Sequence, residues 1–327
     1  MDLVLALDLG GTKIAAALVD RNGRVGEVVA VPTPALDGPA AIVAAATGAL
    51  GEVLARGWDG TPVVAAAGEH RVRGLGVGTA GVVDVAAGTI VSATDTLAGW
   101  TGTPLRGDLE RALAALTGAR LPVHVLNDVD AHALGEVRHG AAAGAASALV
   151  VGVGTGIGAG VVVRGELLRG AHHVAGEMGH LPVAGADHLR CPCGRSGHLE
   201  AIGSGVGMYR HYLSLGGDPE VGGGRGVAER AAAGDSLAGR ALRDSAAAVG
   251  RGIAAVVTVL DPERVVVTGG VPAAGSAWWS AMDEALRGQL IDILANVPVV
   301  PGKLGGTAPL AGAAAAVRQL IDTEGAP

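Results

Sequence analysis

The hydrophobic positions of this 327-residue chain fall into short continuous runs near its start and into longer stretches of helical spacing further on. Residues 3–8 and 14–19 are apolar runs of strand length, and they flank the glycine-rich turn 9–13. Strands buried on both faces show such continuous runs. We therefore predict a β-hairpin at the start of the chain, with a possible phosphate-binding loop at its turn.

The same order of strand, glycine-rich turn and strand returns in the second half of the chain. Apolar runs at 148–153 and 159–163 flank a second glycine-rich turn at 154–158. Recurrence of a supersecondary unit within one chain is typical of repeated architectures. The sequence therefore predicts an internally duplicated fold.

Helical and strand-like patterns alternate through the rest of the chain, which favours βαβ units and an α/β fold class. Residues 121–126 form a strand that runs into Asn127 and Asp128, and Asp128 could cap a helix that ends near 139–140. The other predicted elements are helices at 39–56, 104–117, 204–215, 236–260 and 309–322, strands at 74–77 and 264–267, and a loop at 216–226.

The length of the chain exceeds that of most domains with a single core, so two lobes are expected. We predict a small N-terminal lobe at 1–117, to which a C-terminal helix within 306–322 returns. The large lobe then covers 118–305 and contains a candidate zinc-binding segment at 177–200.

The charge of the chain argues against nucleic acid as a partner. The formal net charge is −7, and the two lysines, Lys13 and Lys303, belong to no basic run. No basic leader and no long uninterrupted apolar span is seen, so we expect a cytoplasmic protein that makes no use of a membrane.

The first glycine-rich turn offers the groups that bind a nucleotide's phosphates. Gly10 and Gly11 leave backbone N–H groups uncovered, Thr12 adds a hydroxyl, Lys13 adds a cation, and the Asp8 carboxylate could orient Mg²⁺. Glycine is abundant, with 56 residues, so glycine pairs also arise by chance. The turn matches neither the dinucleotide fingerprint nor the P-loop spacing.

The second turn strengthens the interpretation, because Gly154, Thr155 and Gly156 occupy the same place in a matching hairpin. Gly269 and Gly270 follow another predicted strand, where a bare backbone could approach an adenosine. An ordinary tight turn explains that last pair about as well.

Asn127 and Asp128 follow a buried strand, which is a frequent position for catalytic acids in α/β proteins. An aspartate within reach of a sugar hydroxyl can accept its proton during phosphoryl transfer. A simple helix cap is the competing interpretation. Asp130 competes for the role of base, but we expect its side chain to point away on the helix.

Both cysteines of the chain, Cys191 and Cys193, are two residues apart, which suits metal binding better than a mutual disulfide. His180 and His198 flank them, and two thiolates with two imidazoles form a usual tetrahedral Zn²⁺ site. His188 is a rival ligand. Core packing of the cysteines and a partly buried His180 would be the plain alternative.

The motifs occur in the order seen in sugar kinases of the ROK family, the repressor, open reading frame and kinase group, which the whole chain resembles. That resemblance implies an actin-like ATPase (ribonuclease H-like) duplicated fold, two lobes that close over sugar and ATP, and transfer of the γ-phosphoryl group to a hexose hydroxyl, usually O6. The motifs are Asp8-x-Gly-Gly-Thr-Lys13, Asn127-Asp128, Gly154-Thr-Gly156, Gly176-Glu177-x-Gly-His180 and Cys191-x-Cys193-Gly-x-x-Gly-His198-x-Glu200.

By the same resemblance, Asp128 corresponds to the catalytic base, and His180 serves both zinc and sugar through its two ring nitrogens. Zinc there has an orienting role. Dimers are usual among the relatives, so a homodimer or a higher homo-oligomer is expected. The sugar-binding set implied by the resemblance is Gly81, Asn127, Asp128, Glu177, His180 and Glu200.

This chain departs from the family pattern at two places. His198 stands where most relatives have a third cysteine, and Ala80 precedes Gly81 where the sugar-loop turn usually reads Pro-Gly. The repressors of the family carry a DNA-binding domain ahead of the sugar-binding part, for which we expect no room here, because Asp8 lies seven residues from Met1.

We therefore predict an ATP-dependent hexose kinase that acts on O6 of glucose, with ATP, Mg²⁺ and a structural Zn²⁺. A kinase for an amino sugar or an N-acetylated sugar, such as N-acetylglucosamine, N-acetylmannosamine or kanosamine, is the alternative within the fold. A non-catalytic sugar-sensing protein is the alternative from another class.

Overall fold

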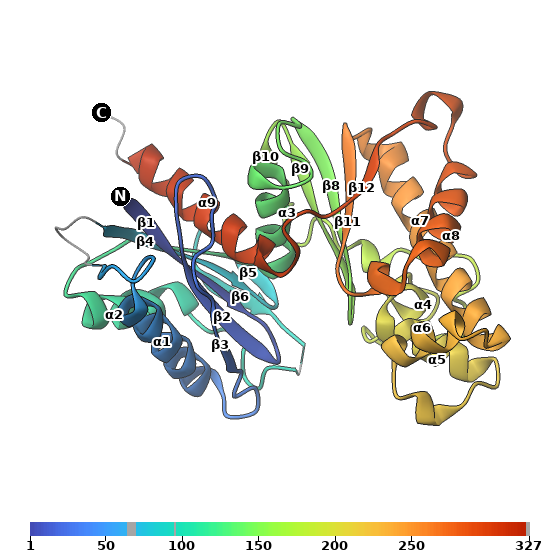
Figure 1. Ribbon diagram of the computed structural model, residues 1–327, viewed down its shortest axis with the longest axis horizontal. Coiled ribbons are helices and arrows are strands. Elements are labelled where there is room, and N and C mark those ends of the chain that lie inside the picture. Colours follow the sequence, from blue (N-terminus) through green and yellow to red (C-terminus); the bar gives the residue numbers. More distant parts are fainter. Residues whose placement is uncertain (64–69, 95, 325–327) are drawn as a thin grey trace. The chain divides into compact units, whose positions relative to one another are not determined.

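The computed structural model describes residues 1–63, 70–94 and 96–324. The chain divides into two compact units (Figure 1), each with its own five-stranded sheet. The first unit comprises Met1–Gly144, Leu167–Val174 and Lys303–Pro327, and the second comprises Ala145–Glu166 and Ala175–Gly302.

The sheet of the first unit has the strand order β3-β2-β1-β4-β7. Strands β1, β2 and β3 are antiparallel neighbours, whereas β4 and β7 run parallel to β1. The carboxyl ends of β1, β4 and β7 therefore meet at one edge. The strands are β1 (Asp2–Leu9), β2 (Lys13–Val19), β3 (Val29–Pro32), β4 (Arg71–Thr79) and β7 (Val123–Asn127).

Both faces of this sheet are covered, which explains the continuous apolar run of β1. Alternate residues of a strand point to opposite faces. Leu3 and Leu5 belong to the core that includes α1 (Pro39–Arg56) and α2 (Leu105–Thr117), whereas Val4 packs with residues of α9 (Ala308–Glu324) on the other face. The helix α3 (Asp128–His139) lies beside α9 (Figure 1).

A small hairpin, β5 (Val82–Asp84) and β6 (Thr89–Ser92), completes the first unit. Among the described residues, α1 is the one helix long and apolar enough, by length and composition, to cross a membrane. Its residues Ile42, Leu50 and Val53 are buried in the core of the unit, as expected for a core helix.

The sheet of the second unit has the order β10-β9-β8-β11-β12, which repeats the topology of the first. Again the first hairpin is antiparallel and the later strands are parallel to its first strand. The duplicated fold predicted from the two hairpins is therefore present. The strands are β8 (Ser147–Val153), β9 (Ile157–Val163), β10 (Glu166–Leu167), β11 (Arg264–Thr268) and β12 (Val299–Pro301).

Five α-helices of the second unit enclose one core with its sheet. The longest, α7, begins at an N-cap, Asp235, whose side chain accepts hydrogen bonds from two backbone N–H groups. It packs closely on α8, because a Cβ at Gly250 would lie 2.1 Å from the carbonyl oxygen of Met282. These helices are α4 (Glu200–Gly203), α5 (Gly205–Ser214), α6 (Gly224–Ala232), α7 (Ser236–Leu260) and α8 (Ser276–Arg287).

Short 3₁₀ turns connect several of these elements. In chain order they are Met178–His180, Pro219–Val221, Val271–Ala274, Asp292–Leu294 and Gly305–Thr307.

The structure corrects three expectations from the sequence. The cap of α3 is Asn127, and Asp128 is the first helical residue. The predicted loop 216–226 contains a 3₁₀ turn and the start of α6, and α8 was not predicted. The first unit continues past 117 to Gly144, because β7 pairs with β4 and α3 packs on α9.

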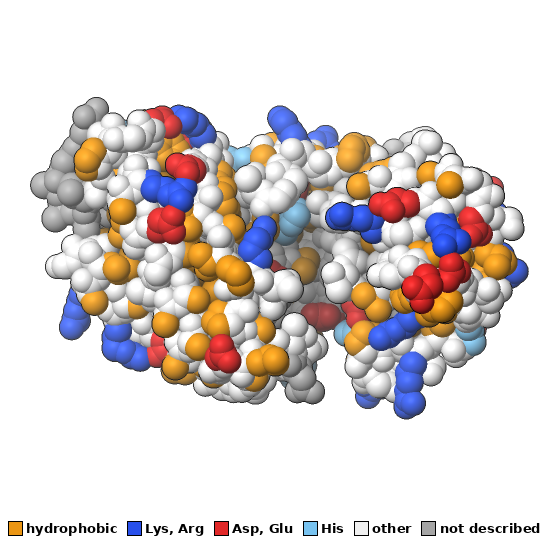
Figure 2. Space-filling model, turned by 60° about the horizontal axis from the view of Figure 1, so that its bottom comes forward, with side chains coloured by type: hydrophobic (Ala, Val, Ile, Leu, Met, Phe, Trp, Pro, Cys, Tyr) orange, Lys and Arg blue, Asp and Glu red, His pale blue; other side chains and the backbone are white. Residues whose placement is uncertain are grey.

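Charged side chains are mixed in sign on the face seen in Figure 2, where Lys and Arg lie scattered among Asp and Glu. No continuous basic stripe crosses the visible surface of either unit. That face therefore lacks the concentrated positive charge of a nucleic-acid footprint.

Candidate functional site

Two carboxyl groups of the first unit lie together at the carboxyl edge of its sheet. Asp8, near the end of β1, is in register with Gly78 of β4. A Cβ at Gly78 would lie 3.0 Å from Cβ of Ala131 and 3.7 Å from Cα of Asp128. The bare backbone of Gly78 therefore lets the first turn of α3 settle beside Asp8.

This placement changes the protonation of both groups. Burial in the first place, and then the nearby charge of Asp8, raise the pKa of Asp128 to about 7, while the hydrogen bond from the backbone N–H of Val129 opposes the rise. Burial also raises the pKa of Asp8 to about 6, against the attraction of Lys13. Asp128 is thus poised to gain or lose a proton near neutral pH.

Asn127 fixes the entry to α3. Its Oδ1 accepts hydrogen bonds from the N–H groups of Val129 at 2.8 Å and Asp130 at 3.2 Å. Its Nδ2 donates to the carbonyl oxygen of Gly81 at 2.9 Å. One amide therefore caps the helix and ties it to the turn after β4.

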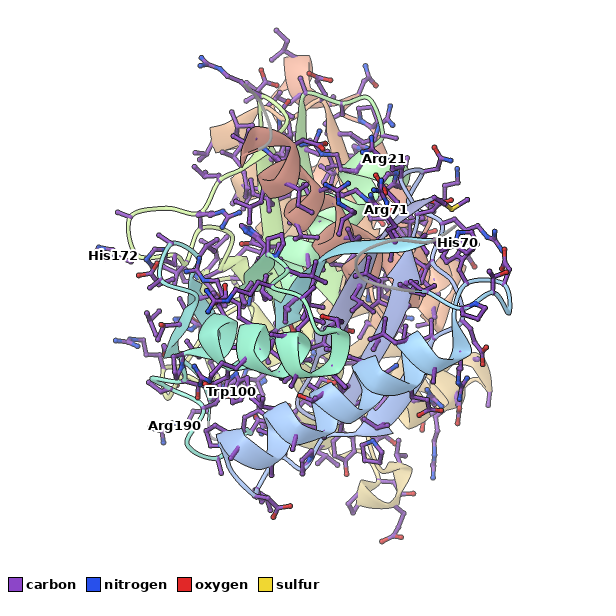
Figure 3. The ribbon with its side chains drawn as sticks, turned by 90° about the vertical axis from the view of Figure 1, so that its left-hand side faces the viewer. Arg21, His70, Arg71, Trp100, His172 and Arg190 are labelled. Carbon is purple, nitrogen blue, oxygen red and sulfur yellow. The ribbon has the colours of Figure 1, made fainter. Side chains whose placement is uncertain are left out.

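The turn that carries Gly81 is fixed from three sides. Gly81 adopts a φ of 99°, which favours glycine. The neighbouring Ala80 donates its N–H to Leu9, and its carbonyl oxygen accepts from Nε1 of Trp100, a side chain labelled in Figure 3. These bonds hold the turn although Ala80 replaces the usual proline.

The first glycine-rich turn is braced by a residue that the sequence did not single out. The hydroxyl of Thr33 donates to the carbonyl oxygen of Gly10 at 2.7 Å, and the N–H of Thr33 donates to the carbonyl oxygen of Thr12 at 3.1 Å. A Cβ at Gly11 would lie 2.7 Å from Cγ2 of Thr96. Thr33 follows the short strand β3, whose recognition in the sequence would have pointed to it.

The second glycine-rich turn is packed against a carboxylate. The N–H of Ile157 donates to Oε2 of Glu200 at 2.8 Å. A Cβ at Gly156 would lie 2.6 Å from the same oxygen, whereas a Cβ at Gly154 would meet nothing within 4 Å. Two candidate sites predicted separately, the Gly154–Gly156 turn and Glu200, are therefore in direct contact.

The segment with Glu177 and His180 lies flat on β9 because of its two glycines. A Cβ at Gly176 would lie 1.8 Å from the carbonyl oxygen of Ala159, and one at Gly179 would lie 2.3 Å from that of Ile157. This backbone places Nε2 of His180 at 3.7 Å from Oε2 of Glu177. Burial raises the pKa of Glu177, against the influence of His180.

The structure gathers four candidate metal ligands, His180, Cys191, Cys193 and His198, whose ligand atoms lie within 4.8 Å of one another. Nδ1 of His180 is 3.6 Å from Sγ of Cys191, and Nδ1 of His198 is 3.2 Å from Sγ of Cys193. A tetrahedral zinc ion with bonds of about 2.0–2.3 Å separates its ligands by roughly 3.3–3.8 Å. The donor set suits a tetrahedral Zn²⁺, and the two N–S separations of 3.6 and 3.2 Å lie close to that range.

The rival ligand, His188, lies elsewhere in the described part of the second unit. Its Nε2 is 3.4 Å from the hydroxyl of Ser214, and its ring centroid is 5.5 Å from that of His211. It is not among the four grouped ligands. The turn that carries the two cysteines is closed by a backbone hydrogen bond, in which the N–H of Gly194 donates to the carbonyl oxygen of Cys191 at 2.9 Å.

The last predicted glycine pair lies after β11. Gly269 has a φ of 101°, and a Cβ there would lie 2.3 Å from the carbonyl oxygen of Val153, the residue before Gly154. A Cβ at Gly270 would meet nothing within 4 Å. Gly269 is therefore required for the close approach of two backbones, whereas Gly270 leaves its surroundings open.

Comparison with known proteins shows that this chain is similar to sugar kinases. The chain is 30% identical to a glucokinase of Streptomyces coelicolor over 98% of both chains, and 34% identical to an N-acetylmannosamine kinase of Citrobacter koseri over 90% of both. Among solved structures, a ROK family glucokinase from Streptomyces griseus in complex with glucose and AMPPNP is 32% identical, with a TM-score of 0.78 over 97% of this chain and 99% of that one.

The likeness to this kinase structure confirms the actin-like ATPase fold that the sequence predicted. The model of the ROK family matches residues 4–320, which is nearly the whole length of the chain. This protein therefore belongs to the ROK family.

Proposed function

We propose that this protein is an ATP-dependent sugar kinase that transfers the γ-phosphoryl group of ATP to O6 of glucose, with Asp128 as the general base. The observation that carries the proposal is the placement of Asp128, beside Asp8 at the carboxyl edge of the sheet with a pKa raised by burial to about 7. The relatedness to glucokinases, one of them solved with glucose and AMPPNP, supports the choice of sugar and nucleotide.

In the proposed step, the ionised Asp128 accepts the proton of the sugar hydroxyl. The hydroxyl oxygen forms the new bond to the γ-phosphorus, and the bond from that phosphorus to the β-γ bridging oxygen breaks and leaves ADP. A base with a pKa near the working pH combines a sufficient ionised fraction with adequate basicity. Asn127 acts as a positioning residue, because it fixes the start of α3.

The nucleotide is assigned to the glycine-rich turns. In the first unit, the candidate phosphate-binding residues are Gly10, Gly11, Thr12 and Lys13. In the second unit, they are Gly154, Thr155 and Gly156, and Gly269 and Gly270 offer bare backbone to an adenosine. Such turns present backbone N–H groups to anions without side chains in the way. Asp8, a partly buried carboxyl next to Lys13, fits a Mg²⁺ ion or its waters, and bound Mg²⁺ would offset phosphate charge.

The candidate sugar-binding residues of the first unit are Gly81, Asn127 and Asp128, and those of the second unit are Glu177, His180 and Glu200. Carboxylates and an oriented imidazole accept and donate hydrogen bonds to sugar hydroxyls. His180 directs Nδ1 toward the cysteines and Nε2 toward Glu177. A structural Zn²⁺ held by His180, Cys191, Cys193 and His198 would fix this tautomer and the orientation of the ring.

A coupled assay for ADP release tests the proposal, with glucose, mannose, glucosamine, N-acetylglucosamine, N-acetylmannosamine and kanosamine as substrates. We expect turnover with glucose. Asp128→Asn should bind the sugar and lose about 10²- to 10⁴-fold in kcat. Asp130→Asn, the same change two residues on, is the matched control and should stay near wild type. Unchanged turnover in Asp128→Asn would remove Asp128 from the role of base.

A kinase for N-acetylated or amino sugars is the second candidate, because an N-acetylmannosamine kinase is as similar to this chain as the glucokinases are. Preference for such a sugar in the same panel would select it. No ADP release with any of the six sugars would favour a non-catalytic sugar-sensing protein.

We also propose a homodimeric or higher homo-oligomeric protein of the cytoplasm, where ATP and free sugars are available. Light scattering coupled to size-exclusion chromatography measures the oligomeric state directly. A monomer across the concentration range of the kinase assay would contradict this part of the proposal.

A further inference from the structure

A cluster of arginines lies at the edge of the first sheet opposite to the one with Asp8. Arg71 is in register with Asp2 at the amino end of β1, whereas Gly78 is in register with Asp8 near its carboxyl end. A strand rises about 3.3 Å per residue, so roughly 20 Å separate the two edges. Figure 3 shows Arg21 and Arg71 on this side of the unit, and both approach Asp2.

Two cavities open at this edge, with volumes of about 370 and 440 Å³. They share Arg21, Arg318 and Asp322 as lining residues; Arg73 lines the first, and Arg138 lines the second. Among the described lining residues, four arginines therefore face one carboxylate. This is an excess of positive charge in a chain whose formal net charge is −7.

Among the described residues, the carboxylate of Asp2 lies within 4 Å of three arginines at this edge. Asp2 accepts hydrogen bonds from Arg71 at 2.9 Å and from Arg73 at 3.3 Å, while Arg21 approaches it only to 3.9 Å. Arg318 is anchored by a hydrogen bond of 2.7 Å from its Nη2 to the carbonyl oxygen of Val19. That bond holds the guanidinium in place without neutralising it.

Arg21 and Arg318 consequently repel each other across the shared wall. Burial, and then the charge of Arg21, lower the pKa of Arg318 against the opposing influence of Asp20, Asp2 and Asp322. An anion between two guanidinium groups relieves such repulsion and gains charge-assisted hydrogen bonds. Arginine suits phosphate in particular, since its planar fork matches two phosphate oxygens.

We propose that these two cavities form a binding site for a small phosphorylated anion, either inorganic phosphate or a phosphate monoester such as a sugar phosphate. The phosphoryl group contacts Arg21 and Arg318. Either cavity exceeds the size of a phosphate ion and falls in the range of small-molecule pockets, so an organic group attached to the phosphate can be accommodated. The site is separate from the glycine-rich turns and does not depend on the kinase assignment.

Isothermal titration of the full chain with inorganic phosphate, and separately with glucose 6-phosphate, tests the proposal. A non-hydrolysable ATP analogue and glucose are present at saturating concentration, and the ionic strength is kept constant with NaCl. We expect one site per chain, weakened about tenfold by Arg21→Gln and by Arg318→Gln. Arg111→Gln is the matched control; Arg111 is exposed, pairs with Asp108, and lines neither cavity.

The side chain of Arg21 is 67% exposed, so Arg21→Gln should fold even where Arg318→Gln loses stability with its bond to Val19. Tighter binding of glucose 6-phosphate than of phosphate would identify the monoester as the ligand, and the reverse would identify the free ion. Absence of binding by both probes, or equal affinity in wild type and Arg21→Gln, would overturn the proposal. So would equally effective displacement by chloride, the behaviour of a general counter-ion site.

Discussion

The contact between Gly156 and Glu200 allows a single methyl group to test whether Glu200 holds the sugar. In Gly156→Ala the new Cβ would lie 2.6 Å from Oε2 of Glu200, well inside an ordinary contact distance. The carboxylate is the end of a flexible side chain, so it can move aside and leave the fold intact. That movement breaks the 2.8 Å hydrogen bond from the N–H of Ile157.

The size of the effect follows from that lost bond. A hydrogen bond to a charged group contributes about 1.5–3 kcal/mol. Since about 1.4 kcal/mol corresponds to a factor of ten, we expect the KM for glucose to rise roughly 10- to 100-fold. Gly154→Ala adds the same methyl group two residues earlier, where nothing lies within 4 Å, and should leave the KM for glucose within about twofold of wild type.

Steady-state kinetics with glucose and ATP varied in turn separate this effect from a general disturbance of the turn. In a Glu200→Ala background, Gly156→Ala should cause no further rise in the KM for glucose, because the group it displaces is gone. An unchanged KM for glucose in Gly156→Ala would refute the reasoning. Equal effects of Gly154→Ala and Gly156→Ala would refute it as well.

Three further predictions follow from the same geometry. The pKa of Asp128 is raised to about 7, so Asp128 loses its ionised form as the pH falls below that value, and kcat/KM should drop about tenfold per pH unit there. A flat profile of kcat/KM from pH 5 to 8 would argue against Asp128 as the base. His198→Cys should keep one zinc per chain by mass spectrometry of the metal, whereas His198→Ala should weaken binding; equal retention in both would exclude this ligand. Gly250→Ala forces a Cβ to 2.1 Å from the Met282 carbonyl oxygen, so it should lower the free energy of unfolding by about 1–3 kcal/mol or more, as measured by thermal unfolding. Gly239→Ala on the same helix should leave the free energy of unfolding unchanged or raise it.

Local signals in the sequence were sufficient to predict an element where its hydrophobic pattern was regular and proline or another helix-ending residue marked its bounds. The helices α1 and α7 were predicted with the bounds that they have, because Pro39 and the pair Asp261-Pro262 mark their ends. The two hairpins and the duplication were also predictable, since sheets covered on both faces leave continuous apolar runs.

Two of the missed elements, the strands β3 and β12, have little local pattern. β3 and β12 have four and three residues, too few to establish a period of two, and their pairing with longer strands forms them. The cap of α3 was assigned one residue late, because Asn127 and Asp128 are both good N-caps and only the contact of Asn127 with Gly81 separates them.

Within the candidate site, sequence reasoning identified residues but not their contacts. Glu200 and Ile157 are 43 positions apart, and no local rule links a carboxylate to that N–H group. The same holds for Thr33, whose hydroxyl reaches Gly10 across 23 positions. Such partners depend on the sheet topology, which places distant turns side by side.

The two copies of the duplicated sheet differ in where they place carboxyl groups. Asp8 stands two residues before the first turn glycine, Gly10, and the corresponding position before Gly154 is Gly152. The first copy thus places the carboxyl of Asp8 in the sheet. Burial raises the pKa of both Asp8 and Asp128.

The candidate sugar-binding carboxylates of the second copy lie outside its strands: Glu177 precedes a 3₁₀ turn and is 47% exposed, and Glu200 is the first residue of α4. Water reaches such groups in part, so they can exchange water for sugar hydroxyls at modest cost. A base that works near neutral pH needs a raised pKa, and Asp128 has one of about 7. The asymmetry of the duplication therefore places the two carboxyls with pKa values raised to about 6 and about 7 in the first unit, at the carboxyl ends of its strands.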